Sequence, residues 1–374
     1  MAERAVASVN LAAIERNTAL VDEAAGEAIV CAVVKADGFG HGAVPAARAA
    51  LAGGASWLAV ASAGEAAALR AAGFGEPVLV MGALTPEETA VAVEAGADLV
   101  AWSGEFAGLV EELGGAPLHV KYDSGMGRLG TRDADEATAI AERIAESGSC
   151  RLAGLMTHFA TADRPGDPFF DEQLARFRDW ALPLADRYPD ALVHAANSAA
   201  VLREPACAFD MVRSGVALYG LDPFGSDAGA RGLEPALELR SWAGAVKPCE
   251  PGQSVGYGRA FVADRETTIA TVPVGYGDGW RRALGNHSEV LVGGARRPVV
   301  GAVSMDNLTV DLGPGSGVVA GEEVILIGVA GSERITAEEI AAELGTINYE
   351  VTCAISPRVR RAYHRDGRAE EPGA

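Results

Sequence analysis

The chain has 374 residues, of which 49% are hydrophobic and 22% are charged, as in an ordinary folded protein. This length predicts two domains, one of which can be an α/β barrel of roughly 200 to 250 residues. The formal net charge of −20 argues against nucleic acid and anionic membrane surfaces as partners, because like charges repel.

The sequence contains neither a signal peptide nor an apolar run of the roughly 20 residues that a membrane span requires. Its five cysteines are scattered, without a CxxC pair or a Cys/His spacing typical of a metal site. We therefore expect a cytoplasmic protein that binds no metal.

In the first 233 residues, apolar runs alternate with Ala-rich amphipathic stretches. Strands are expected at Ala28–Val34 and from near Ser56, Pro77, Ala97, Pro117, Leu152, Leu192 and Phe209. Helices are expected at Leu11–Glu23, Ala43–Leu51, Gly64–Ala72, Pro86–Ala95 and Asp133–Ala145. This alternation predicts a parallel sheet, and eight units predict a closed (β/α)8 TIM-type barrel over residues 1–233. The alternative is an open doubly wound sheet, but no GxGxxG motif follows the first strand.

Residues 234–374 have a different pattern, with shorter strands separated by Gly and Pro. Strands are expected at Leu237–Val246, Thr267–Val274, Glu289–Val292, Pro298–Val303, Leu308–Leu312 and Glu323–Ile327, and a helix near Thr336–Leu344. We predict a mostly antiparallel C-terminal β domain, to which the first ten or so residues can add a strand. The charged tail after about residue 364 is expected to be frayed.

Polar residues follow several of the predicted barrel strands, where barrel enzymes place their catalytic groups. Lys35 comes directly after the first strand. A lysine that leaves a buried strand is partly desolvated, which favours the neutral amine that forms Schiff bases. The alternative for Lys35 taken alone is an ordinary surface lysine.

Two other strand ends carry candidate site residues. Lys121 and Arg128 flank Asp123 and two glycines, which fits a clamp for a substrate carboxylate or a turn with solvated charges. His158 follows the sixth strand, either in a polar network or as a satisfied core histidine.

The seventh and eighth strands end in residues that suit a phosphate site. Asn197 and Ser198 stand at a helix start, where they act as an N-cap or bind an anion with the free backbone N–H groups. Arg213 and the segment Ser214–Val216 follow, and barrel enzymes often bind phosphate after strands 7 and 8. A lysine facing such a site across the barrel mouth is the layout that a pyridoxal phosphate (PLP) enzyme needs.

These segments resemble those of the alanine racemases over nearly the whole chain and in the same order. The segment Val33–Gly42 resembles the signature around the PLP-binding lysine of that family. The other similar segments are Lys121–Gly130, Thr157–Asp163, His194–Ala200, Met211–Gly220, Ser254–Arg259, Pro273–Trp280, Ser304–Asp306 and Thr346–Arg361.

The resemblance implies a fold-type III PLP enzyme that interconverts L- and D-alanine and supplies D-alanine for peptidoglycan. It also implies a head-to-tail homodimer, in which each active site takes residues from the partner's C-terminal domain. Lys35 and Tyr257 would be the two catalytic bases, on opposite faces of the substrate's Cα. Racemisation needs such a pair, because one group removes the proton and the other returns it.

The resemblance assigns further residues to the cofactor and the substrate. The cofactor-binding residues would be Lys35, His158, Asn197, Ser198, Arg213, Gly215, Val216 and Tyr349. The substrate-binding residues would be Lys121, Arg128, Tyr276 and Met305. Arg213 would contact the pyridine nitrogen, which then stays unprotonated because arginine does not readily give up a proton. Lys121 would orient Arg128 and can carry a carbamate.

The sequence departs from the family pattern at three places. Phe39 stands where tyrosine is usual, so PLP would lose a phosphate contact worth about 0.5–1.5 kcal/mol. Ala302 stands where arginine is common, which leaves the substrate preference open. Asp37-Gly38 replaces Asn-Ala, a conservative change for a turn.

Three other functions remain as alternatives. A racemase for serine or another small amino acid differs from an alanine racemase in only a few pocket side chains. A non-catalytic PLP carrier would lack the C-terminal domain, which this chain has. A decarboxylase of the same fold type would need a Cys-Asp pair, whereas Cys249 and Cys353 are followed by Glu250 and Ala354.

Overall fold

The computed structural model describes residues 3–370. The chain divides into two compact units. The barrel unit contains Ile14–Gly38 and Ala43–Leu218, and the sheet unit contains Met1–Ala13, Phe39–Gly42 and Tyr219–Ala374. Residues 219–233, which the sequence placed with the barrel, thus belong to the sheet unit.

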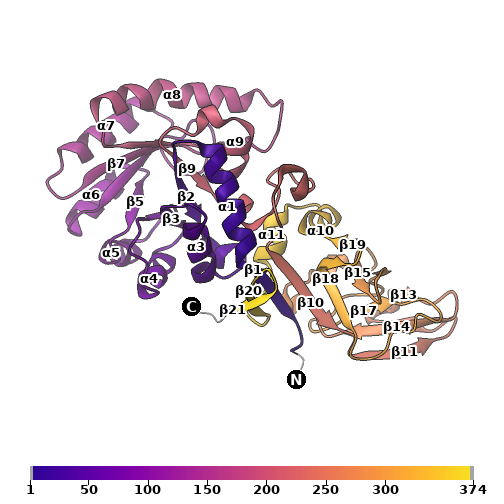
Figure 1. Cartoon of the computed structure of the whole chain (residues 1–374). Helices are drawn as coiled ribbons and strands as arrows, with labels where there is room; N and C mark the ends of the chain where they lie inside the picture. Colours follow the sequence, from indigo (N-terminus) through magenta and orange to yellow (C-terminus); the bar gives the residue numbers. More distant parts are fainter. Residues whose placement is uncertain (1–2, 371–374) are drawn as a thin grey trace. The chain divides into compact units, whose positions relative to one another are not determined.

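The barrel unit is built on eight parallel strands (Figure 1). They are β2 (Ile29–Val33), β3 (Trp57–Val60), β4 (Val78–Val80), β5 (Asp98–Ala101), β6 (Pro117–Lys121), β7 (Arg151–Met156), β8 (Leu192–His194) and β9 (Met211–Ser214). They pair in the order β8-β7-β6-β5-β4-β3-β2-β9. The edge strands β8 and β9 meet where the amides of Asp210 and Arg213 donate to the carbonyls of Val193 and Ala196, at 3.0 and 2.9 Å. The predicted (β/α)8 barrel is confirmed.

The barrel helices are α1 (Leu11–Ala25), α3 (Ala43–Ala52), α4 (Ala63–Ala71), α5 (Pro86–Glu94), α6 (Gly104–Glu112), α7 (Ala134–Glu146), α8 (Phe169–Arg187) and α9 (Ser198–Arg203). Five of them, α1, α3, α4, α5 and α7, begin and end close to the predicted positions, and α6, α8 and α9 are further helices. Capping boxes start α4, with Ser62 and Glu65, and α5, with Thr85 and Glu88. The strands are almost continuously apolar, because the sheet of such a barrel is covered on both faces.

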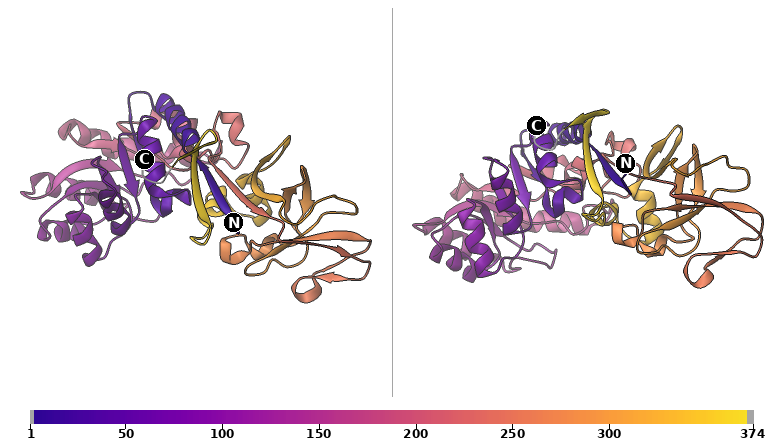
Figure 2. Two further views of the ribbon diagram at one scale, coloured as in Figure 1. Left: turned by 60° about the horizontal axis from the view of Figure 1, so that its bottom comes forward. Right: turned by 90° about the horizontal axis from the view of Figure 1, so that it is seen from below.

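The sheet unit contains a mostly antiparallel sheet in the order β16-β15-β18-β10-β1-β20-β21 and a three-stranded sheet in the order β11-β14-β17. The strands are β1 (Val6–Asn10), β10 (Leu237–Trp242), β11 (Ala245–Cys249), β12 (Ser254–Val255), β13 (Phe261–Val262), β14 (Thr267–Val272), β15 (Glu289–Val292), β16 (Ala295–Pro298), β17 (Leu308–Asp311), β18 (Glu323–Ala330), β19 (Glu333–Ile335), β20 (Arg360–Arg365) and β21 (Arg368–Glu370). The helices are α10 (Ala337–Leu344) and α11 (Asn348–Cys353). Figure 2 shows β1 between β10, with which it pairs antiparallel, and β20, with which it pairs parallel.

Three predictions about the sheet unit need correction. The strand expected at Leu237–Val246 is two strands in different sheets, β10 and β11, because the chain leaves the first sheet at Ala243 and Gly244. The strand expected at Pro298–Val303 is instead β16, at Ala295–Pro298, because Gly293 and Gly294 make a tight turn after β15 with φ of 59° and 74°. The tail expected to be frayed from about residue 364 contains the β20–β21 hairpin. Residues 371–374 lie outside the described residues.

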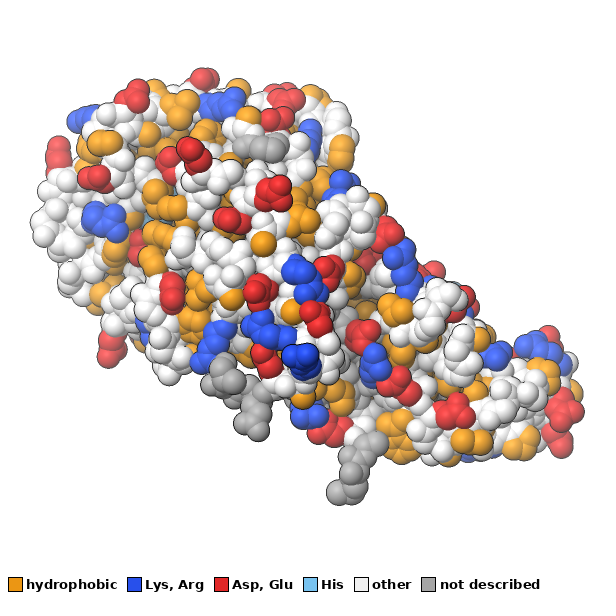
Figure 3. Space-filling view, in the orientation of Figure 1, with side chains coloured by type: hydrophobic (Ala, Val, Ile, Leu, Met, Phe, Trp, Pro, Cys, Tyr) orange, Lys and Arg blue, Asp and Glu red, His pale blue; other side chains and the backbone are white. Residues whose placement is uncertain are grey.

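On the face drawn in Figure 3, acidic and basic side chains are interspersed over both units. Among the described residues, no helix is long and apolar enough to cross a membrane. Within the same residues, no group of three or more His, Cys, Asp or Glu side chains could hold a metal ion.

Candidate active site

Lys35 lies where β2 ends and an unusual turn begins. The side chain is half-buried, and the short element α2 (Lys35–Phe39) is a left-handed turn. Ala36, Asp37 and Phe39 have φ of 52°, 53° and 53°, which costs a non-glycine residue about 1–2 kcal/mol. Gly38, with φ of 61°, adopts this conformation without a Cβ penalty, so it suits the turn better than the alanine usual in the family.

Hydrogen bonds hold this turn in place. The amide of Ala36 donates to Glu65 Oε1 at 2.6 Å, and the amide of Gly38 donates to the Val34 carbonyl at 2.9 Å. The carboxylate of Asp37 accepts from the Ala43 amide at 2.9 Å. The turn therefore fixes the backbone on the C-terminal side of Lys35, as is common for strained segments at functional sites.

The barrel unit gathers an excess of positive charge. Lys121, which is 4% exposed, has its pKa lowered to about 8, mainly by burial and then by Arg128 and Arg213, with a smaller contribution from Lys35. Burial and the same cations, together with Lys121, hold the pKa of His158 well below its usual range. The structure thus brings together five of the predicted site residues, and this surplus of cations suits an anionic ligand such as a carboxylate or phosphate.

The loop between Lys121 and Arg128 is shaped by Asp123. Its carboxylate accepts from the amides of Gly125 and Gly127 at 3.1 and 2.9 Å, and from Arg132 Nε at 3.2 Å. Burial alone would raise the pKa of Asp123, but these donors lower it below its usual value. Asp123 therefore shapes the loop that carries Arg128.

Hydroxyls and amides cluster after β8 and β9. Ser198 Oγ lies 3.0 Å from Ser214 Oγ and accepts from the Gly215 amide at 2.9 Å. Val216, buried, follows directly. Such donors suit a phosphate. Asn197 caps α9 by accepting from the Ala200 amide at 3.0 Å, so its side-chain oxygen has the structural role that the sequence left open.

Arg213 is 3% exposed and its guanidinium is fixed on two sides. Nη1 donates to His194 Nδ1 at 2.6 Å, and Nη2 donates to the carbonyls of Thr157 and Ala195 at 2.7 and 3.1 Å. Burial lowers the pKa of Arg213 to about 10, so the group stays cationic at neutral pH.

The other predicted site residues belong to the sheet unit and are exposed. Tyr257, Met305 and Tyr276 are 75%, 52% and 44% exposed. Tyr257 lies beside a shallow pocket of about 360 Å³ whose lining includes Ala302. The absence of an arginine side chain at position 302 thus leaves open space next to the candidate base.

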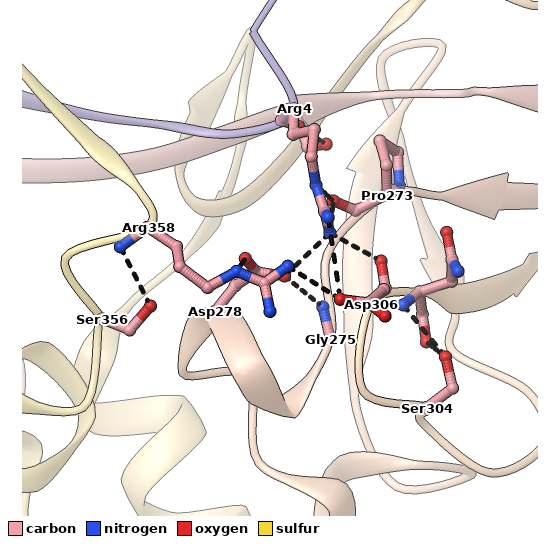
Figure 4. Close-up of polar contacts among 10 residues, drawn as sticks. Arg4, Pro273, Gly275, Asp278, Ser304, Asp306, Ser356 and Arg358 are labelled. Atoms are coloured by element: carbon pink, nitrogen blue, oxygen red, sulfur yellow. Dashed lines mark hydrogen bonds and ion pairs between the residues drawn. The ribbon is translucent and has the colours of Figure 1, made fainter.

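The loops that carry Tyr276 and Met305 are tied together (Figure 4). The amides of Tyr276 and Gly277 donate to the carbonyls of Ser304 and Met305 at 3.0 and 2.9 Å. Four charged side chains then join the loops: Arg4 contacts Asp278 at 3.1 Å, and Arg358 contacts Asp306 at 2.7 Å and Asp278 at 3.3 Å. We call Arg4, Asp278, Asp306 and Arg358 the loop clamp.

Tyr349, a predicted phosphate ligand, lies in α11 near an aromatic cluster. Its ring centroid is 6.1 Å from that of Phe39, which is itself 5.1 Å from that of Tyr219. Phe39 is buried in this cluster. The phenylalanine ring at this position, where tyrosine is usual, therefore packs against the neighbouring aromatic rings.

Sequence reasoning gave no role to His119 and His194 and did not consider Asp98. All three are buried, and they extend inward from Arg213 through hydrogen bonds of 2.8 Å between the histidines and 3.2 Å from His119 to Asp98. The sequence signal that could have revealed this network is a histidine inside an otherwise apolar strand, because a buried polar side chain needs hydrogen-bond partners.

Comparison with known proteins identifies related chains over almost the full length. The model of the alanine racemase N-terminal domain matches residues 9–223, and that of the alanine racemase C-terminal domain matches residues 236–363. An alanine racemase of Frankia casuarinae is 44% identical over 96% of both chains, and one of Symbiobacterium thermophilum is 41% identical over 96% of both.

Solved structures agree with these matches. The crystal structure of alanine racemase from Bacillus anthracis with bound L-Ala-P has a TM-score of 0.91 and 38% identity, over 99% of this chain and 97% of that one. The structure of alanine racemase from Streptomyces coelicolor has a TM-score of 0.90 and 38% identity, over 96% and 97%.

Proposed function

This chain belongs to the alanine racemase family, and on that premise we propose that it is a PLP-dependent enzyme that interconverts L- and D-alanine. The observation that carries the proposal is the cationic cluster of the barrel unit, where Lys35 stands with Lys121, Arg128 and the buried Arg213. The cations around Lys35 suit an anionic cofactor and substrate, and a lysine amine is the group that binds an aldehyde.

Residues of the barrel unit fit each part of the cofactor. Lys35 would hold PLP covalently, and Ser198, Gly215 and Val216 would hold its phosphate. The family resemblance adds Tyr349, a residue of the sheet unit, as a further phosphate ligand. Arg213 has no acceptor to offer and keeps its charge at neutral pH, so it would donate to the pyridine nitrogen. Bound PLP supplies the electron-withdrawing group that makes the substrate's Cα–H acidic.

The chain's own residues would move one proton at Cα. Lys35 Nζ and Tyr257 Oη would lie on opposite faces, so that one takes the Cα proton while the other delivers a proton to the opposite face. Arg128, aligned with help from Lys121, Tyr276 and Met305, would bind the substrate carboxylate. His158, held neutral by its lowered pKa, would link Tyr257 with Arg213.

The second base would come from a partner chain in a homodimer. Tyr257, Tyr276 and Met305 are large side chains that are 44% or more exposed in the sheet unit. A phenol works as a base at Cα only where water is excluded and cations are near. A head-to-tail dimer would meet both needs by bringing these side chains to the partner's barrel mouth.

Lys121 is proposed to carry a carbamate. A lysine whose pKa is about 8 has a substantial neutral fraction near that pH, and only the neutral amine adds to carbon dioxide. The carbamate would replace a cation by an anion and so give Arg128 an ion-pair partner. In the cell, we place the enzyme in the cytoplasm, where it would supply D-alanine for peptidoglycan.

The test uses the small number of lysines. The chain has only Lys35, Lys121 and Lys247, so reduction of the purified holoenzyme with borohydride must leave the label on one of three assignable peptides. We expect the label on Lys35, and α-proton exchange and inversion of L-alanine in heavy water. Turnover of L-serine or L-lysine in place of alanine would show that the substrate is a different amino acid. A label with no turnover would favour a PLP carrier. A label on Lys121 or Lys247 would overturn the assignment of Lys35.

A further inference from the structure

Four buried side chains from four strands form a continuous chain of hydrogen bonds inside the barrel. Arg213 Nη1 lies 2.6 Å from His194 Nδ1, His194 Nε2 lies 2.8 Å from His119 Nδ1, and His119 Nε2 lies 3.2 Å from Asp98 Oδ2. We call these four residues the relay. Asp98 is the first residue of β5, so the relay ends at the rim of the barrel opposite to the strand ends that carry the cationic cluster.

The fold makes room for the contact between the two histidines. Strand β7 lies between β6 and β8, and its Gly154 pairs with His119 on one side and Leu192 on the other. A Cβ at Gly154 would lie 2.2 Å from His119 Nδ1, so any side chain there would obstruct the bond to His194. The register between β6 and β7 also shifts between Leu118 and His119.

The chemistry of the donors sets the direction of every bond. Arginine has donors only, so His194 Nδ1 must accept and the proton of the neutral ring lies on Nε2. His194 Nε2–H then donates to His119 Nδ1, and His119 Nε2–H donates to the Asp98 carboxylate. Both imidazoles therefore have the same tautomer, which Arg213 requires of His194 and Asp98 requires of His119.

We propose that Asp98 and His119 are positioning residues for the racemase: Asp98 holds the proton of His119 on Nε2, so that His119 Nδ1 accepts from His194 Nε2–H and the His194 ring stays oriented against the Arg213 guanidinium. The proposal rests on the function proposed above, in which Arg213 faces the cofactor's ring nitrogen. Asp98 and His119 act through two intervening groups, much as a carboxylate orients a catalytic histidine through its other ring nitrogen.

The surroundings keep the relay in this single state. Burial lowers the pKa of His119 despite its bond to Asp98, and burial, Arg213 and His119 hold the pKa of His194 well below its usual range. Cys31, opposite Arg213 in the β2–β9 register, has its pKa raised to about 12 by burial and stays a neutral thiol. Arg151, which lies 4.0 Å from Asp98, is mostly exposed. At neutral pH the relay thus has a positive end at Arg213, a negative end at Asp98 and two neutral imidazole rings between them.

The first measurement is the tautomer itself. Nitrogen NMR of the holoenzyme labelled with ¹⁵N-histidine is expected to show two non-titrating Nε2–H imidazoles between about pH 6 and 9. In His119→Phe, which keeps the ring volume, His194 Nε2–H loses its acceptor, so its nitrogen resonance should shift while Arg213 still holds the proton on Nε2. Asp98→Leu removes the acceptor of His119, which should then show a mixture of tautomers, whereas Asp98→Asn keeps an acceptor oxygen and should keep the wild-type pattern.

The second measurement is kinetic and spectroscopic. Asp98→Leu and His119→Phe are each expected to lower kcat about tenfold with KM for alanine nearly unchanged, the loss expected for one buried polar contact. Both should also shift the pH dependence of the visible absorption band of the holoenzyme, and Asp98→Asn should restore both readouts. The matched control is Asp210→Leu, which removes an exposed carboxylate that accepts from the Val193 amide at 2.7 Å but lies outside the relay.

Two results would overturn the proposal: a wild-type His194 with its proton on Nδ1, or an Asp98→Leu variant that behaves as Asp210→Leu does in every readout. If Asp98→Leu does not fold, Gly154→Ala breaks the relay without changing any of its members, and the same outcomes apply. If the wild type does not racemise alanine, the proposed function fails, but the NMR pattern and the absorption band still decide whether Asp98 controls His194.

Discussion

In the barrel unit, Lys121 and Arg213 are 4% and 3% exposed, whereas Tyr257, Met305 and Tyr276 of the sheet unit are 75%, 52% and 44% exposed. The first set is held by strands and by hydrogen bonds among buried groups. The second set is presented on loops, two of which are joined by partly exposed ion pairs in the loop clamp. The difference indicates that the buried cations of the barrel unit are held in place by contacts within that unit. The exposed side chains of the sheet unit, by contrast, can act in catalysis only when another surface excludes water from them.

The largest expected effect comes from the exposed side of this comparison. Tyr257→Phe should lower kcat for alanine racemisation by about 10²–10⁴-fold, because it removes the proton that one face needs, while the visible absorption of the holoenzyme stays unchanged. Tyr276→Phe removes a second exposed hydroxyl and serves as the control, with a much smaller loss. A Tyr257→Phe enzyme of wild-type activity would remove Tyr257 from the chemistry.

The same variant can show whether the two sets come from different chains. A mixture of inactive Lys35→Ala and Tyr257→Phe chains, refolded together, should regain racemase activity, because one site of each mixed dimer then has both groups intact. A site made within one chain would always keep one defect. No recovery in a verified mixed dimer would therefore contradict shared sites.

The next prediction concerns the buried Lys121 and the dependence of the protein's stability on pH. In buffer free of carbon dioxide, where Lys121 carries no carbamate, its pKa falls from 10.5 to about 8 on folding, so between these values the unfolded chain binds more protons than the folded one. Stability should therefore rise as the pH increases from about 8 to 10.5, by up to about 3 kcal/mol from this group. Denaturant unfolding of wild type and Lys121→Met should differ in slope over this window, and Lys247→Met, at an exposed position, should not. Identical slopes for all three would show that Lys121 is not desolvated as described.

The loop clamp should have a smaller effect, because its arginines are partly exposed. Arg4→Gln is expected to raise KM for alanine about two- to fivefold with kcat nearly unchanged, since it loosens the loops that carry Tyr276 and Met305. Arg360→Gln breaks the exposed pair with Glu3 in the same unit and provides the matched control. An equal effect of the two variants would mean that Arg4 has only a general structural role.

A change of similar size is expected at Phe39. Phe39→Tyr should tighten PLP binding by about two- to tenfold, the value of one hydrogen bond, as measured by the dissociation constant for PLP. A weaker cofactor affinity would indicate that the hydroxyl cannot leave the aromatic cluster with Tyr219 and Tyr349.

Much of the barrel could be predicted from sequence, because its signals are local. Strand β2 was expected at Ala28–Val34 and lies at Ile29–Val33, and the position of Lys35 directly after it already indicated a site. Helix α5 was recognisable because Pro86 and the capping pair of Thr85 and Glu88 lie within four consecutive residues.

The features that sequence did not reveal depend on residues far apart in the chain. Arg4 reaches Asp278 only because β1 joins a sheet of strands from the other end of the sequence. His119 and His194 bond across a third strand, which depends on a register shift and on the missing side chain of Gly154. Neither of these two contacts follows from a spacing of residues in the sequence. The left-handed turn after Lys35 also has no sequence signal, since alanine and aspartate rarely adopt that conformation.

The distribution of the three lysines has a practical consequence for handling the protein. Lys121 is buried, Lys35 would be occupied by the cofactor, and Lys247 is exposed on β11. Apart from the amino terminus, an amine-reactive dye or an activated resin would thus find a single accessible attachment point in the holoenzyme, on a strand of the sheet unit. The protein should tolerate immobilisation through amines with its catalytic lysine intact.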